Sequence, residues 1–413
     1  MADYQDKPRL RPVEAIPTEH EGRRMIALHD PAGFAHGLLT ITEPVLLLLT
    51  HFDGEHTLED VRGAFARQTG QDVLLEQLQD LVRQLDEALF LEGPTFEAHV
   101  ERIEAAFREM PARFTQPDSG LGVELHQLPM ALKEILEGGK PAVPAGRVVG
   151  LIAPHLDLRR GANCYADAYG VLGRAGWADR YVVLGTNHFG RCGSVVATTK
   201  EFATPLGRTP SDADLIQRLN RDCGVDLCEH EYDHAREHSV ELQVLFLQQA
   251  FYRQPFRIVP VLCPDPCGPT GTQPYDGQGV DLRVFAEALG DALRDDGTPT
   301  CIIAGADLSH VGRRFGDDAD LADGFLQSVE AHDRAALKAV EANDPEAFRT
   351  SLAESGNPTR ICSAGSIYTL MTTLRRAYDP ARLSAHLLRY EQAADGPEDT
   401  CVTCAAVAFT LNE

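Results

Sequence analysis

Cysteine is absent from the first 163 residues, and all ten cysteines of this 413-residue chain lie at or after Cys164 with irregular spacing. Disulfide frameworks belong to small secreted domains in which cysteines recur at short intervals, so this distribution favours reduced thiols. The two closest pairs are Cys263 with Cys267 and Cys401 with Cys404. These pairs differ in spacing and lie far apart in the sequence, which argues against a zinc site built from them.

Basic residues and long apolar runs are also scarce. Lys and Arg number 38 against 62 Asp and Glu, for a net charge of −24. Phosphates attract cations and repel carboxylates, so this balance disfavours binding to nucleic acid or to an anionic membrane. No apolar run approaches the roughly 20 residues of a membrane-spanning helix, and the N-terminal residues lack the apolar core of a secretory signal. We therefore expect a cytoplasmic protein with neither nucleic-acid nor membrane partners.

Residues 1–95 form a first predicted domain. A strand, helices and a terminal strand follow one another, with a capping-box pair at Thr57 and Asp60 and apolar residues at helical spacing over 73–89. This order is typical of a small winged-helix-type domain and resembles the PqqD-like peptide-recognition domains. The segment carries eight Lys and Arg against seventeen Asp and Glu, a net charge of −9. A DNA reader needs a basic face, so we expect a peptide or protein partner instead.

The rest of the chain alternates between strands and helices. After a helical linker at 96–145, residues 146–413 place apolar, β-branched runs at 147–154, 180–185, 257–263 and 300–305 between amphipathic helices. Strands that alternate with helices predict an α/β domain with a mostly parallel or mixed central sheet flanked by helices.

Polar, chemistry-bearing side chains follow the predicted strands. They are His155 and Asp157 after the first strand, His188 after the second, and Asp307, Ser309 and His310 after strand 300–305. His238 and Glu241 share one face at the start of helix 237–252. Ligands bind beyond the carboxyl ends of such strands, and imidazole is a common ligand of iron, copper and zinc. We therefore predict a metal or acid–base site there.

Five segments, in order, carry a family resemblance: LIAPHLDLRRGANCYADAY, VVLGTNHFG, FATPLGRTPSD, EHSVELQVLFL and IIAGADLSHVG. Over roughly 145–410 the chain resembles the Memo family (AmmeMemoRadiSam system protein B). The resemblance implies an α/β sandwich related to type III extradiol ring-cleavage dioxygenases. Those enzymes hold non-haem Fe(II) with two histidines and a carboxylate, and use a further histidine for acid–base catalysis. Some Memo-like proteins are associated with metal or copper binding.

The resemblance implies roles for particular residues. His155 and His188 match the two metal-ligand histidines, and His238 matches the acid–base histidine. The third ligand, a cysteine in animal relatives, falls on Ser309, which is a poor ligand for a soft metal. Either Asp307 or His310 then replaces it, or the metal is weakly bound or absent.

Two further carboxylates complete the predicted catalytic set around His238. Asp157 stands where many relatives have a different residue, and it could orient the His155 imidazole. Glu241 shares the helix face of His238.

Two functions follow. The first is a metal-dependent, dioxygenase-like oxidoreductase that uses Fe(II) or copper in redox or oxygen chemistry on a small molecule. The alternative is a non-catalytic adaptor that binds a partner peptide or protein through residues 1–95. A metal-dependent hydrolase is a weaker, third possibility.

Overall fold

The computed structural model describes residues 3–20, 22–35, 37–116, 120–139, 141–318, 321–396 and 400–412. The chain divides into two units, residues 1–110 and 111–413. Helix α5 (Pro94–Glu109), which the sequence places mostly in the linker, groups with the first unit. Across the described residues, no helix combines the length and apolarity needed to cross a membrane.

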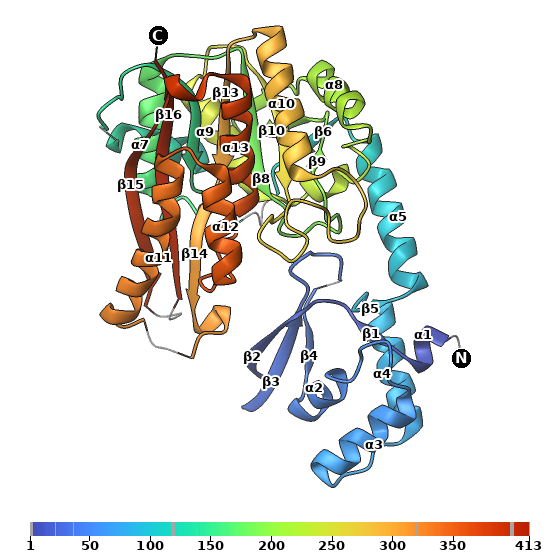
Figure 1. The fold of residues 1–413 in the computed structure, drawn as a ribbon. Helices are drawn as coiled ribbons and strands as arrows, with labels where there is room; N and C mark the ends of the chain where they lie inside the picture. Colours follow the sequence, from blue (N-terminus) through green and yellow to red (C-terminus); the bar gives the residue numbers. More distant parts are fainter. Residues whose placement is uncertain are drawn as a thin grey trace. The chain divides into compact units, whose positions relative to one another are not determined.

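The first unit pairs a small antiparallel sheet with helices (Figure 1). Its elements are α1 (Asp3–Asp6), β1 (Arg9–Leu10), β2 (Glu14–His20), β3 (Arg23–His29), β4 (Leu39–Ile41), α2 (Glu43–Leu49), α3 (Leu58–Thr69), α4 (Leu75–Glu87), β5 (Leu91–Glu92) and α5. The sheet order is β2-β3-β4, and β1 pairs with β5. The predicted capping box is confirmed, because the Thr57 side chain accepts from the Asp60 N–H and Asp60 accepts from the Thr57 N–H.

The second unit is built on a mixed sheet. The strands of the second unit are β6 (Ala112–Phe114), β7 (Arg147–Ala153), β8 (Arg180–Thr186), β9 (Val196–Ala197), β10 (Glu201–Thr204), β11 (Gly207–Thr209), β12 (Arg257–Cys263), β13 (Thr300–Gly305), β14 (Asp307–Gly312), β15 (Leu383–Asp395) and β16 (Thr400–Leu411). The main sheet has the order β14-β16-β7-β13-β8-β12-β9, with β15 paired to β16. Strands β7, β13, β8 and β12 run parallel, whereas β9 is antiparallel to β12 and β16 is antiparallel to β7, β14 and β15. The expected mixed α/β architecture is confirmed.

Helices cover both faces of this sheet (Figure 1). They are α6 (Leu128–Gly138), α7 (Ala162–Ala175), α8 (Ala213–Cys223), α9 (His238–Ala250), α10 (Leu282–Asp296), α11 (Asp323–Glu341), α12 (Pro345–Ser355) and α13 (Ala364–Ala377). Successive strand residues face opposite sides, so Tyr181 and Val183 pack with α6, α7 and α9. Val182 and Leu184 pack instead with α8 and α10 to α13. Burial on both faces explains why these strands are almost uniformly apolar.

The predicted strand 300–305 is followed at once by another strand. Asp307, Ser309 and His310 follow strand 300–305 as expected, and they belong to β14, which begins two residues after β13 ends. The strand forms because β16 pairs with it, with Asp307 opposite Cys404 and His310 opposite Val402. The register shifts between Asp307 and His310. This irregularity affects which of the three side chains can reach the site.

Candidate metal centre

Three histidines converge where β7 and β8 end and α9 begins. One nitrogen from each of His155, His188 and His238 lies within 4.8 Å of the others. The ring centroids are 4.9 Å apart for His155 and His188, and 5.1 Å apart for the stacked rings of His188 and His238. The predicted convergence of these three histidines is therefore confirmed, and the group could hold a metal ion.

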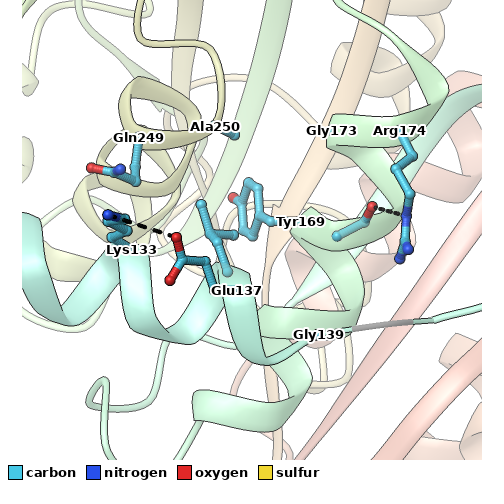
Figure 2. Close-up of a pocket in the computed structure, with 10 residues that line it drawn as sticks. Lys133, Glu137, Gly139, Tyr169, Gly173, Arg174, Gln249 and Ala250 are labelled. Atoms are coloured by element: carbon cyan, nitrogen blue, oxygen red, sulfur yellow. Dashed lines mark hydrogen bonds and ion pairs between the residues drawn. The ribbon is translucent and has the colours of Figure 1, made fainter.

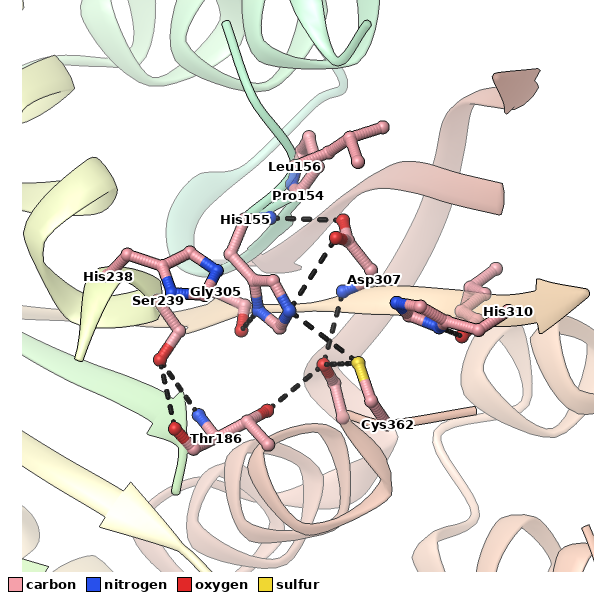
Figure 3. Close-up of polar contacts among 12 residues, drawn as sticks. Pro154, His155, Leu156, Thr186, His238, Ser239, Gly305, Asp307, His310 and Cys362 are labelled. Carbon is pink, nitrogen blue, oxygen red and sulfur yellow. Dashed lines mark hydrogen bonds and ion pairs between the residues drawn. The ribbon is translucent and has the colours of Figure 1, made fainter. Parts of the chain in front are cut away.

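Hydrogen bonds determine which nitrogen of His155 is available. Its Nδ1 lies 2.9 Å from the carbonyl oxygen of Gly305, which can only accept, so Nδ1 carries the proton (Figure 3). The unprotonated Nε2 then points toward the Cys362 Sγ and the Asp307 Oδ2, each 3.5 Å away. Asp307 also accepts from the His155 N–H at 3.0 Å. Burial lowers the pKa of His155 and raises the pKa of Asp307 to about 6. The imidazole is thus neutral and oriented as a ligand.

Glu237 orients the second histidine from the N-terminus of α9. It caps the helix by accepting from the Ser239 N–H, and its carboxylate lies 3.1 Å from the His188 Nδ1. Burial opposes charge on both groups, but their mutual attraction outweighs it, so the pKa of Glu237 falls well below its ordinary value and that of His188 rises well above. This pairing leaves the His188 Nε2 as the nitrogen available to a metal, which would replace a proton there.

His238 stays neutral beside this pair. Burial lowers its pKa to about 3, even though the Glu237 carboxylate 3.6 Å from its Nδ1 favours protonation. A neutral imidazole at ordinary pH has a ring nitrogen that can accept a proton from a bound molecule.

Cys362 is the functional candidate that sequence reasoning missed. Its Sγ lies 3.5 Å from the His155 Nε2 and 3.3 Å from the Ser363 Oγ (Figure 3). Burial raises the pKa of this thiol, but the His310 and His188 side chains outweigh it and lower the pKa to about 7. A sequence signal for it is its place before a helix, because Cys362 directly precedes Ser363, the N-cap of α13, and thiolates are favoured at helix N-termini.

The structure does not bring Ser309 into the cluster. Its hydroxyl lies 2.6 Å from the Asp333 Oδ1 and 2.7 Å from the Thr359 Oγ1, where it helps to satisfy a buried carboxylate. His310 places its Nδ1 3.0 Å from the Leu308 carbonyl and packs edge-on against Phe315. These contacts hold the His310 ring away from the three histidines. Of the predicted third ligands, Asp307 is the one that contacts one of those histidines, with its Oδ2 3.5 Å from the His155 Nε2.

The other two predicted catalytic carboxylates have different partners. Asp157 forms an ion pair with Arg160 and accepts from the backbone N–H groups of residues 159 and 160, so it stabilises the turn after His155. Glu241 is fully buried and forms an ion pair with Arg113. Arg113 also donates to the carbonyl of Glu237 at 3.0 Å, so this pair supports the start of α9.

His234 provides a test of burial near the cluster. Its Nε2 lies 3.2 Å from the Val196 carbonyl, and burial lowers its pKa to about 4. In the unfolded chain this pKa is near 6.5, so His234 lowers stability as the pH falls from about 6.5 to about 4. His234→Gln removes this penalty. As the pH falls from about 6.5 to about 4, we therefore expect the unfolding free energy of the wild type to decrease by about 3 kcal/mol relative to that of the variant. Urea unfolding followed by the fluorescence of Trp177, the chain's single tryptophan, measures it. A constant difference would contradict the assignment.

Sequence comparisons with known proteins identify one family. A family model described as Memo-like protein matches residues 124–408. A MEMO1 family protein of Aquifex aeolicus (strain VF5) is 24% identical over 92% of this chain and 95% of its own length. One of Thermus thermophilus is 28% identical over 81% of this chain and 94% of its own. A crystal structure of an uncharacterized Escherichia coli K12 protein is 15% identical, with a TM-score of 0.38, over 63% of this chain and 99% of its own.

Proposed function

This chain belongs to the Memo-like protein family, and from that premise we propose that it is a metal-dependent oxidoreductase acting on a small molecule. His155 and His188 would hold the ion through their Nε2 atoms, and Cys362 would supply the third ligand. His238 would move protons. The observation that carries the proposal is the convergence of His155 and His188, which follow the parallel strands β7 and β8, with His238 at the start of α9.

The donor set suits a transition metal. Two imidazoles have their Nδ1 atoms engaged by Gly305 and Glu237, which is the usual way in which proteins orient metal-binding histidines. The thiol beside them has a pKa lowered to about 7, so it ionises readily. Imidazole with thiolate favours copper, zinc or iron over magnesium or calcium. If Asp307 replaced Cys362, the set would become two histidines and a carboxylate, the arrangement of non-haem Fe(II) oxygenases.

A bound iron or copper ion would supply one-electron and oxygen chemistry that side chains lack. The protein's own groups would supply orientation and proton transfer. His238 would accept a proton from a substrate hydroxyl, and the Glu237 carboxylate would stabilise the resulting imidazolium against the burial that lowers the pKa of His238. Asp307 would keep the loop after β7 in place through the His155 N–H.

The adaptor alternative loses its main motivation. It depended on serine standing at the third-ligand position, and the Ser309 hydroxyl is committed to Asp333 whereas Cys362 offers a thiol next to His155. A peptide or protein partner for residues 1–95 is compatible with either function. The support for such a partner is the net charge of −9 of that segment and its PqqD-like pattern.

Anaerobic metal reconstitution tests the proposal. We expect the full chain to retain about one equivalent of Fe(II) or copper by elemental analysis after desalting. A variant carrying both His155→Ala and His188→Ala should retain almost none, because two of three ligands are gone. His126→Ala, which changes an exposed histidine of the same unit, is the matched control and should behave as the wild type. Equal retention by the double variant would rule out this site.

A further inference from the structure

A cavity of about 370 Å³ opens beside the candidate metal centre, at the carboxyl ends of the neighbouring parallel strands β8 and β12. Thr186 and Asn187 line it from the end of β8, and Cys263 lines it from the end of β12. Small-molecule pockets of 300 Å³ or more commonly form at this edge of α/β sheets. Its position and size are those of a ligand pocket.

Cys362 connects the cavity to the histidine cluster. Its side chain lines the cavity, and its Sγ lies 3.5 Å from the His155 Nε2. A molecule that filled the cavity would therefore touch a residue of the proposed metal centre. The remaining walls are largely Gly, Pro, Thr, Asn and Gln, which offer hydrogen bonds without charge.

The residues that line the cavity carry a net negative charge. None of the described residues that line it is Lys or Arg, and Asp265 is the charged member of the set. Burial raises the pKa of the Cys192 thiol in the cavity wall, and the carboxylates of Asp233, Asp276 and Glu229 raise it further. These carboxylates would repel an anion in the cavity and attract a cation.

Tyr275 gives the cavity a flat wall. A Cβ added to Gly193 would lie 2.3 Å from the Tyr275 Cε1, so the ring rests directly on the glycine backbone. The residue is still 71% exposed, which leaves the other side of the ring open to a ligand. A tyrosine face attracts aromatic rings and cations.

We propose that this cavity is the substrate pocket, and that it selects a small aromatic molecule that is neutral or positively charged and rejects carboxylates and phosphates. The selection comes from Asp265, from the absence of a lining cation and from the Tyr275 face. Calling the ligand a substrate rests on the proposed function, whereas the charge selection does not depend on a bound metal.

A second cavity supplies an internal control. It measures about 460 Å³ and lies among α6, α7 and α9, lined by Lys133, Glu137 and Arg174 (Figure 2). The Lys133 Nζ lies 3.7 Å from the Glu137 Oε1, and the Arg174 Nε donates to the Gly170 carbonyl at 2.9 Å. Two cations face one carboxylate, so an anionic probe bound here would be released by Arg174→Ala.

The test uses three probes that share a 4-hydroxyphenyl ring and differ in charge: tyrosol (neutral), tyramine (cation) and 4-hydroxyphenylacetate (anion). Their binding to the full chain is titrated by ligand-observed NMR, with and without Fe(II). We expect the anion to bind at least about tenfold more weakly than tyrosol, the change produced by about 1.4 kcal/mol of repulsion. Tyr275→Ala should weaken the binding of tyrosol and tyramine. Gln273→Lys should reduce or reverse the difference in affinity between tyrosol and 4-hydroxyphenylacetate. Tyr252 lies outside the cavity and is 75% exposed, so Tyr252→Ala should leave the affinities of all three probes unchanged.

The possible outcomes separate this inference from the metal proposal. If the anion binds as tightly as tyrosol in Arg174→Ala, or if Tyr275→Ala and Gln273→Lys have no effect, the pocket inference is overturned. The double variant His155→Ala/His188→Ala should keep the charge preference. A protein that retains no metal but still prefers the neutral and cationic probes would contradict the metal proposal alone.

Discussion

Replacing Cys362 with serine is expected to abolish stoichiometric metal retention while the protein stays folded. The Cys362 Sγ lies 3.5 Å from the His155 Nε2, and serine keeps the shape of the side chain but removes the soft thiolate ligand. Loss of a hydrogen-bond partner of a metal ligand weakens binding by roughly 10–100-fold, so loss of a ligand should cost at least as much. Elemental analysis after desalting measures the retention. In the copper(II)-loaded or cobalt(II)-loaded protein, the thiolate-to-metal absorption band should disappear.

Two matched variants make this result specific. Cys223→Ser changes a half-buried thiol in α8 and should retain metal as the wild type does. Ser309→Ala should also retain metal, because its hydroxyl binds Asp333 and Thr359 rather than the histidines. If Cys362→Ser keeps its metal and Ser309→Ala loses it, the assignment from the sequence resemblance is correct and ours is wrong. If Asp307→Asn alone loses metal, the carboxylate is the third ligand.

The second large effect concerns stability. Arg113 and Glu241 form an ion pair in which the side chains are 1% and 0% exposed. Arg113→Met would leave the Glu241 carboxylate buried without its cation, and breaking such a pair costs about 3–5 kcal/mol. We expect a loss of this size in the free energy of unfolding of the second unit. Urea denaturation followed by the fluorescence of Trp177, the chain's single tryptophan, reports on that unit.

A double variant separates this structural role from the catalytic role predicted for Glu241. Arg113→Met combined with Glu241→Leu replaces both charges by apolar groups, which is often close to neutral for stability. The combined variant should recover most of the loss and should still retain metal. If it is stable but fails to bind metal or to turn over substrate, Glu241 belongs to the chemistry and the structural assignment fails.

The class of the fold and the position of two histidines at the site could be predicted without the structure. Strands 147–154 and 180–185 are recognisable because burial on both faces demands near-continuous apolar residues, which is a local property. His155 and His188 were predicted to lie at the site because both come after such strands, and the carboxyl ends of parallel strands share one edge of the sheet. The family resemblance then assigned them as ligands. Helix 237–252 was also predicted, with His238 in its first turn.

Which polar groups face one another could not be predicted, because it depends on contacts between distant parts of the chain. Cys362 and His155 are 207 positions apart, and Arg113 meets the carbonyl of Glu237 across 124 positions, separations over which no spacing rule operates. The family resemblance placed the third-ligand position on Ser309, but in β14, which pairs with β16, its hydroxyl donates to Asp333. Glu241 shares the helix face of His238, yet a buried carboxylate must find a cation, and Arg113 is the one that reaches it. A side chain's role depends on the partner that satisfies its charge, and folding brings that partner from elsewhere in the chain.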